Sequence, residues 1–321
     1  MQRKSVTNCW SGRIDHKERK SSFRYHQMVE VVDSRELVKK VDDTCVLIGF
    51  ECEEGVKRNQ GRLGSAKAPD EIRKELAKLP WRFKEDVRLL DIGNVTCTNG
   101  KLETAQKDLG EKVYHVLSKS LVPIIIGGGH ETLYGHYLGV RQCIGQEADL
   151  GIINLDAHFD LRSYETSSSS GTMFRQILEQ DQNCNYFVLG IQPFGNTQEL
   201  FDTAKKLDVR YMIEEDVTMN NISNIEESIH AFIKQHDYVI LTLCTDVLNA
   251  AFAPGVSAPS PFGLTPDMVR MLIRKIASHP KVRSFDLCEV NPELDEGGRT
   301  VKLGAYFVNE AIVANTEEHT L

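Results

Sequence analysis

Two carboxylates and one imidazole lie within five residues in the segment Asp156-Ala-His158-Phe-Asp160. The segment follows the apolar run 150–155, which is typical of a buried parallel strand. Alternate side chains of an extended segment point the same way, so the two carboxylates and the imidazole can converge on one point. Oxygen and nitrogen ligands suit Mn²⁺ or Zn²⁺, and the excess of carboxylates favours Mn²⁺. The alternative interpretation is a polar turn that only caps a helix.

Three further polar residues follow other apolar runs, namely His130, Asp246 and Glu289. The carboxyl ends of parallel strands share one edge of a sheet, so we expect these residues to meet the Asp-His-Asp segment there. Such sets commonly hold two metal ions about 3.5–4 Å apart, and bound metals lower the pKa of water. This chemistry suits hydrolysis of an amidine or a guanidine. The alternatives are a core or helix-capping role for His130 and Asp246, and a structural ion pair for Glu289.

The elements that must position these residues are apolar runs that alternate with helix-length segments. We expect strands at residues 45–50, 87–92, 122–126, 150–155, 186–190, 209–213, 238–243 and 282–287. Strands that alternate with helices indicate β-α units. The sequence therefore predicts an α/β fold in three layers, α/β/α, around a mainly parallel eight-stranded sheet.

The predicted domain organisation is simple. Residues 1–40 are polar with scattered aromatic side chains, and we expect them to form an N-terminal arm packed on the domain. Residues 41–321 contain no internal repeat and no break in composition. We therefore expect them to form one α/β catalytic domain, a size at which single domains are common.

The composition limits the kinds of molecule that we expect the protein to bind. The chain has 321 residues, of which 26% are charged, a formal charge of -8 and no long basic run, so we expect neither a nucleic-acid nor a membrane partner. Its eight cysteines are irregularly spaced and form no Cys-x-x-Cys pair. No apolar stretch follows residues 1–4, and no run reaches the roughly 18 residues of a membrane span. We therefore expect no signal peptide and a cytoplasmic location.

Three segments resemble the three signatures of the arginase/agmatinase (ureohydrolase) family in order and in spacing. They are Gly-Gly-Gly-His130, Asp156-Ala-His158-Phe-Asp160 and residues 246–255. Together they are highly specific, although the first alone would be weak. The resemblance extends over most of the chain and implies the arginase-like fold.

Four segments further resemble one branch of this family, the formimidoylglutamases of histidine degradation. They are Trp10-Ser-Gly-Arg13, Gly55–Arg62, Asp156–Arg162 and Pro254–Pro259. The family is often trimeric or hexameric, so a homo-oligomer is compatible with the resemblance, although no interface signature is seen.

The resemblance implies two Mn²⁺ ions per subunit. One ion would be bound by His130 and Asp160, the other by His158 and Asp246, and Asp156 would bridge both. The metal-bridging hydroxide would be the nucleophile.

The resemblance also implies catalytic roles for Asp160, Glu289 and the metal-binding His158. Asp160 would hydrogen-bond the hydroxide and then pass its proton to the leaving amine. Glu289 would accept hydrogen bonds from the N–H groups of the substrate.

The sequence departs from the family pattern at two points. Cys244 stands where a carboxylate would bridge the metals, and a soft thiolate is an unusual ligand for Mn²⁺. Three alternatives stay open at this position: Cys244 binds a metal, the cluster is altered, or one metal binds weakly. Ser170-Gly171 replaces a His-Gly pair of arginases, which argues against guanidine chemistry. A disulfide between Cys52 and Cys244 is a further hypothesis, provided that their Cα atoms come within about 7 Å.

A substrate with two carboxylates needs cations near the metals. Arg58, Arg62 and Arg162 lie in the predicted rim loops, and Asn59 and Arg175 are secondary candidates. A planar guanidinium binds a carboxylate in bidentate fashion. Each of these arginines could instead be a solvated surface charge.

The resulting prediction is hydrolysis of N-formimidoyl-L-glutamate to L-glutamate and formamide. Two alternatives stay open. One is another ureohydrolase activity, such as agmatinase or guanidino-acid hydrolase. The other is a non-catalytic binding member of the family, in which Cys244 damages the metal cluster.

Overall fold

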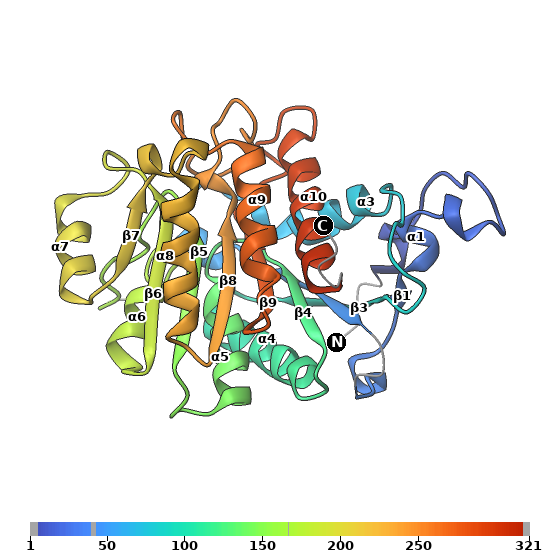
Figure 1. The fold of residues 1–321 in the computed structure, drawn as a ribbon, viewed down its shortest axis with the longest axis horizontal. Coiled ribbons are helices and arrows are strands. Elements are labelled where there is room, and N and C mark those ends of the chain that lie inside the picture. The colour runs from blue at the N-terminus through green and yellow to red at the C-terminus, as the bar shows by residue number, and fades with distance from the viewer. Residues whose placement is uncertain (1–5, 40–42, 166, 317–321) are drawn as a thin grey trace.

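The core of the protein is a nine-stranded sheet in which all pairs are parallel (Figure 1). The computed structural model describes residues 6–39, 43–165 and 167–316. The strands are β1 (Glu30–Val31), β2 (Thr44–Glu51), β3 (Arg88–Thr96), β4 (Val122–Ile126), β5 (Leu150–Leu155), β6 (Cys184–Ile191), β7 (Arg210–Ile213), β8 (Tyr238–Cys244) and β9 (Val282–Cys288). Their order across the sheet is β1-β3-β2-β4-β9-β8-β5-β6-β7.

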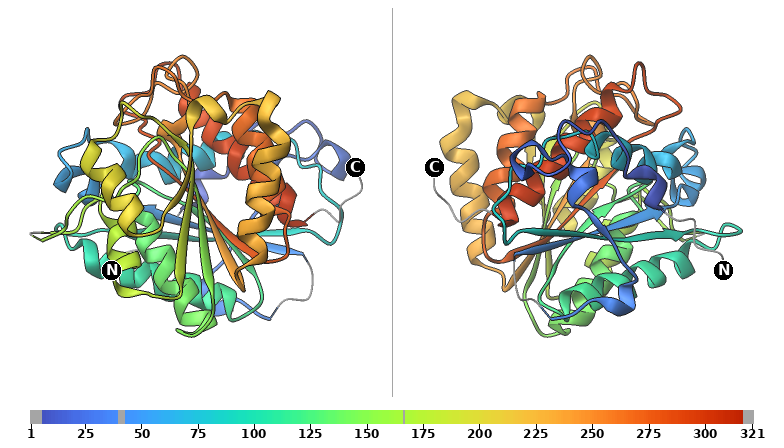
Figure 2. Two further views of the ribbon diagram at one scale, coloured as in Figure 1. Left: turned by 60° about the vertical axis from the view of Figure 1, so that its left-hand side comes forward. Right: turned by 90° about the vertical axis from the view of Figure 1, so that its right-hand side faces the viewer.

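Helices cover both faces of the sheet and complete three layers (Figure 2). One face packs against α3 (Ala68–Leu76), α8 (Ile222–Lys234), α9 (Pro266–Ala277) and α10 (Arg299–Thr316). The other packs against α4 (Leu102–Leu117), α5 (Thr132–Ile144), α6 (Met173–Gln180) and α7 (Gln198–Lys206). The remaining two α-helices of the described residues are short, α1 (Tyr25–Met28) and α2 (Glu54–Arg58). The predicted α/β/α architecture is confirmed.

All eight expected strands are present, and one more joins the sheet. The additional strand β1 has two residues and pairs with β3, Glu30 with Leu90 and Val31 with Asp91. Two residues are too few to give the alternating or apolar pattern from which a strand is predicted. The arm also reaches β3 through Trp10, whose indole Nε1 donates to Asp91 Oδ2 at 2.8 Å. Residues 1–5 and 40–42 lie outside the described residues, and the division into arm and single domain stays a prediction.

Four central strands position the candidate chemistry. In the sheet, β4, β9, β8 and β5 are consecutive neighbours, although other strands and helices separate them in the chain. Nearly every residue of these strands is buried, as expected for a parallel sheet with helices on both faces. Their carboxyl ends therefore lie side by side at one edge. In the described part of the chain, no helix is long and apolar enough to cross a membrane.

Candidate active site

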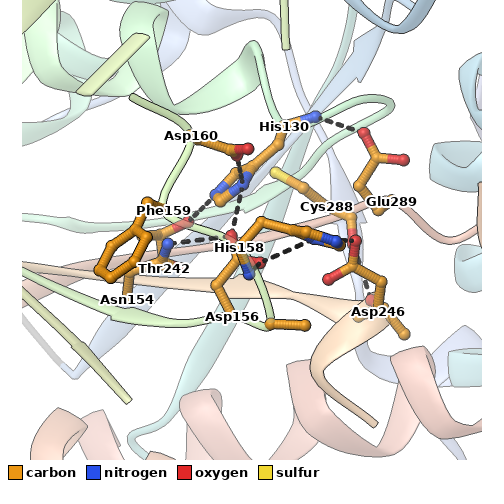
Figure 3. Close-up of polar contacts among 12 residues, drawn as sticks. His130, Asn154, Asp156, His158, Phe159, Asp160, Thr242, Asp246, Cys288 and Glu289 are labelled. Carbon is orange, nitrogen blue, oxygen red and sulfur yellow. Dashed lines mark hydrogen bonds and ion pairs between the residues drawn. The ribbon is translucent and has the colours of Figure 1, made fainter. Parts of the chain in front are cut away.

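Each of the four central strands delivers polar residues to the same edge (Figure 3). His130 follows β4, and the Asp156-Ala-His158-Phe-Asp160 segment follows β5. Cys244 is the last residue of β8, Asp246 lies in the one-turn 3-10 helix Thr245–Val247, and Glu289 follows β9. The expected convergence of these residues is seen in the structure. Most of these side chains are buried, and that of His158 is 27% exposed.

The imidazole of His130 faces two carboxylates. Its Nδ1 atom lies 3.0 Å from Oδ2 of Asp160 and 3.1 Å from Oδ2 of Asp156. The backbone N–H of His130 donates to Oε1 of Glu289 at 2.9 Å. One ring nitrogen and two carboxylate oxygens thus surround one position, which is the arrangement that a bound cation requires.

The imidazole of His158 completes a second, adjoining group. Its Nδ1 atom lies 3.2 Å from Oδ2 of Asp246 and 3.7 Å from Oδ1 of Asp156. Asp156 therefore turns one oxygen toward each histidine, as a carboxylate between two ions would. The other oxygen of Asp246, Oδ1, is buried and has no hydrogen-bond partner among the described residues. A buried carboxylate oxygen without a partner is costly unless a cation or water meets it.

The pKa values of the residues in the cluster also indicate that bound positive charge stabilises it. Burial disfavours the charged form of His130, but Asp156 and Asp160 raise its pKa well above the usual value. Burial and the charge of Asp156 raise the pKa of Asp160 to about 6. Burial, with Glu131 and Asp246 nearby, raises the pKa of Glu289 to about 8. In the metal-free protein, protons compensate this crowding of carboxylates; a metal ion can replace them.

Two site residues hold an unusual backbone conformation. Asp160 has a φ of 51° and Glu289 has a φ of 67°, in the left-handed region that non-glycine residues seldom adopt. Such a conformation costs of order 1–3 kcal/mol and is often found at functional sites. Glu289 adopts it directly after β9 ends, and Asp160 adopts it in the segment that follows β5.

The donor set fits a pair of divalent cations. Ligand atoms of Asp156, His158 and Asp246 lie within 4.8 Å of one another, and so do those of His130, Asp156 and Cys244. Cys244 is therefore within the cluster, and its side chain is 2% exposed. Burial and the charges of Asp156 and Asp246 raise the pKa of its thiol well above the usual value. Cys244 must lose this proton to bind a metal.

A cavity of about 100 Å³ opens onto the cluster. Two of the predicted substrate-binding residues, Asn59 and Arg162, line it. Both lie beside Gly171, since a Cβ atom there would meet Arg162 Cδ at 3.0 Å and Asn59 Oδ1 at 3.1 Å. The guanidinium of Arg162 makes no hydrogen bond or ion pair with any residue that the structure describes, so it is available to a ligand. Ser170, at the position of the missing histidine, also lines the cavity.

The other three predicted arginines do not line the cavity. Arg58 Nη1 lies 2.6 Å from Glu103 Oε1, and Nη2 donates to the Gly100 carbonyl at 3.1 Å. Arg62 donates to the carbonyls of residues 256 and 257, each at 2.9 Å. Arg175 pairs with Glu179 at 2.9 Å. The sequence shows that these arginines lie in or near rim loops but does not reveal which acceptors they satisfy.

The two cysteines of the disulfide hypothesis lie in different surroundings. Cys52 is buried in the core beside α4 and α5, where Glu131 and Cys97 are its polar neighbours. Cys244 faces the carboxylates of the cluster instead. Both are free thiols in the structure.

Sequence reasoning missed two asparagines that support the cluster. Asn196 lines the cavity, accepts from the N–H of Phe159 at 3.0 Å and donates to the Ala157 carbonyl at 2.9 Å, so it shapes the Asp-His-Asp segment. Asn154 donates to Asp156 Oδ2 at 3.0 Å. The sequence does contain an indication for Asn154, since it is the one polar side chain in the apolar run 150–155. Asn196 lies in a polar loop, and the sequence contains no such indication for it.

The fold and the site together define a class of three-layer α/β protein with a carboxylate-histidine cluster at the carboxyl edge of a parallel sheet. Among solved structures, the formimidoylglutamase of Bacillus subtilis superposes with a TM-score of 0.83 over 94% of both chains at 24% sequence identity, which shows the fold. A variant of Trypanosoma cruzi formiminoglutamase solved with two Mn²⁺ ions gives a TM-score of 0.78 at 26% identity, over 85% of this chain and 93% of that chain.

The family follows from the sequence comparison. The model of the arginase family matches residues 43–314, and the chain belongs to that family. Formimidoylglutamase of Lysinibacillus sphaericus is 55% identical over 304 residues, covering 94% of this chain and 94% of that enzyme. Formimidoylglutamase of a Geobacillus species is 52% identical, covering 95% and 94%. The predicted family resemblance is confirmed.

Proposed function

We propose that the protein hydrolyses N-formimidoyl-L-glutamate to L-glutamate and formamide. The observation that carries the proposal is the Asp-His-Asp segment, in which Asp156 turns an oxygen toward each of two histidines while His158 and Asp160 line the cavity. The identity of 55% to a formimidoylglutamase over nearly the whole chain supports this substrate over other amidines.

The residues that would hold two Mn²⁺ ions are those of the two adjoining groups. His130 and Asp160 would serve one ion, His158 and Asp246 the other, and Asp156 both, with Cys244 as a further donor. Bound Mn²⁺ would supply Lewis-acid activation of water near neutral pH. The relative from Trypanosoma cruzi that contains Mn²⁺ supports the choice of this metal.

The chain's own carboxyl groups would move the protons. Asp160 lines the cavity, with its Oδ2 3.0 Å from His130 Nδ1, and is placed to accept a proton from the attacking water and to give it to the departing glutamate nitrogen. Water adds to the formimidoyl carbon, the bond from this carbon to the glutamate nitrogen then breaks, and formamide remains. Glu289 holds the His130 N–H through Oε1, which leaves Oε2 to accept from substrate N–H groups.

The distal end of the substrate would be bound by Arg162 and Asn59. Arg162 has no competing acceptor within the described residues, and a guanidinium is the side chain best matched to a carboxylate. Asn59 offers a side-chain amide beside the same glycine, Gly171. Participation in histidine degradation, a cytoplasmic location and a homo-oligomeric state stay predictions.

The deciding experiment is an assay of the full chain after metal removal. Glutamate release from formimidoyl-glutamate would be measured with and without added Mn²⁺, with arginine and agmatine as control substrates assayed for urea. Glutamate release that requires Mn²⁺, without urea from either control, is the expected result. Urea from a control substrate would replace the proposal with another ureohydrolase activity. If none of the three substrates gives product under reducing conditions, a non-catalytic protein is favoured.

A further inference from the structure

A chain of buried polar groups runs from His130 away from the cavity into the layer between the sheet and α5. Nε2 of His130 lies 3.1 Å from Oγ1 of Thr242, and this hydroxyl donates to Oδ1 of Asp286 at 2.6 Å. The other carboxylate oxygen of Asp286 lies 2.6 Å from Nδ1 of His136. Thr242, Asp286 and His136 are fully buried. None of these three residues faces the cavity or the substrate.

The sheet fixes the first part of this chain. Thr242 in β8 and Asp286 in β9 are directly paired in the parallel register, so their side chains lie side by side on one face. Cys288, two residues further along β9, donates its S–H to Oδ1 of Asp286 at 3.2 Å. A buried carboxylate in this layer is costly and needs several donors, so its presence calls for a function beyond packing.

The direction of each hydrogen bond follows from the chemistry of the groups. An ionised carboxylate only accepts, so the single hydroxyl hydrogen of Thr242 must point at Asp286. The oxygen of Thr242 then offers only a lone pair to His130, and Nε2 of His130 must carry the hydrogen. In the neutral ring, Nδ1 is therefore left with its lone pair facing the space between Asp156 and Asp160.

We infer that Asp286, acting through Thr242, is a positioning residue that sets the tautomer of His130 and thereby prepares Nδ1 to bind a cation. His136 holds Asp286 in turn, since its Nδ1–H donates to the carboxylate while its Nε2 atom has no partner among the described residues. The inference rests on the proposed metal-dependent function. It concerns metal affinity, which is measured without substrate.

Two variants of Thr242 test the first link. Thr242→Val keeps the shape of the side chain and removes the hydroxyl, whereas Thr242→Ser keeps the hydroxyl. Mn²⁺ affinity would be measured on the full chain by the electron paramagnetic resonance signal of free Mn²⁺. Loss of a partner that orients a ligating histidine commonly lowers metal affinity about 10–100-fold. We expect this loss for one of two ions in Thr242→Val and affinity close to wild type in Thr242→Ser.

The second link is tested by Asp286→Asn. His136 Nδ1–H would donate to the new amide oxygen, so the amide NH₂ would face Thr242 and turn its hydrogen toward His130. This selects the opposite tautomer, with the hydrogen on Nδ1. We expect an affinity loss of about 10–100-fold for the same ion. Because Asp286 acts through Thr242, Asp286→Asn should add little in a Thr242→Val background.

Several outcomes would overturn the inference. One is wild-type affinity for both ions in a folded Thr242→Val protein. Another is an Asp286→Asn effect as large in the Thr242→Val background as in the wild type, which would mean that Asp286 acts by general destabilisation. Thermal unfolding of every variant shows whether it is folded. Wild-type protein that binds Mn²⁺ but hydrolyses nothing would refute only the proposed function, and wild-type protein that binds no Mn²⁺ would refute both.

Discussion

Replacing Arg162 by methionine tests the proposed binding of the substrate's carboxylate. The change removes the guanidinium and keeps most of the apolar stem. A hydrogen bond to a charged group contributes roughly 1.5–3 kcal/mol, and Arg162 is exposed, so the lower end of this range applies. About 1.4 kcal/mol corresponds to a tenfold change in an equilibrium constant. We therefore expect the KM for formimidoyl-glutamate to rise about tenfold.

The turnover number should change little, because the carboxylate lies away from the reacting carbon and is bound alike in the ground and transition states. Steady-state glutamate release in the presence of Mn²⁺ gives both constants. Arg162→Lys should fall between wild type and Arg162→Met, since lysine keeps the charge but loses the planar fork. Arg270→Met on α9 is a matched control, because Arg270 is a half-exposed arginine outside the cavity. An unchanged KM in Arg162→Met would refute the assignment, and a fall in turnover alone would place Arg162 at the reacting centre instead.

Three further predictions concern metal, pH and stability. Without metal, the raised pKa values of Asp160 and Glu289 mean that the folded state binds more protons than the unfolded state between about pH 4 and 8. The melting temperature of the metal-free protein should therefore fall as pH rises through this window, and Mn²⁺ should raise the melting temperature more at pH 8 than at pH 5. A metal-free melting temperature that rises with pH would contradict this prediction. Cys244→Asp replaces a thiol that must lose a proton before it can bind a metal, so the Mn²⁺ affinity of the variant should depend less on pH between 7 and 9 than that of the wild type. The metal-free variant should also melt at a lower temperature than the metal-free wild type. An unchanged pH dependence of Mn²⁺ affinity would mean that Cys244 is not a ligand. Arg73→Met leaves the carboxylate of Asp91 buried without the guanidinium that donates to it at 2.8 and 3.0 Å. This change should lower the free energy of unfolding, measured in urea, by about 3–5 kcal/mol. The control Lys74→Met removes an exposed ion pair and should lower the free energy of unfolding by less than about 1 kcal/mol.

The sequence revealed those parts of the fold and site that depend on strong local patterns. The eight longer strands contain stretches rich in apolar residues, and polar residues that follow such stretches must lie at one sheet edge, which is why the convergence of His130, Asp156 and Asp246 was predictable. Strand β1 has only two residues and gives no such pattern. The partners of Arg58 and Arg62 are carbonyls and carboxylates brought near by the fold, so the sequence could not separate them from Arg162. Nor could it reveal the pairing of Thr242 with Asp286, which depends on the register of two strands.

The adjacency of β4, β9, β8 and β5 has a consequence for the order in which the protein is made and folded. His130 and Glu289, which share a hydrogen bond, are 159 residues apart in the chain. Closing so long a loop carries an entropic cost that only the assembled sheet offsets. During synthesis, β9 is the last strand to leave the ribosome, and it inserts between β4 and β8 rather than adding at an edge. A nascent chain that ends before residue 282 therefore lacks both the central strand and Glu289, so the polar groups at the carboxyl edge of the sheet come together only when nearly the whole chain has been made.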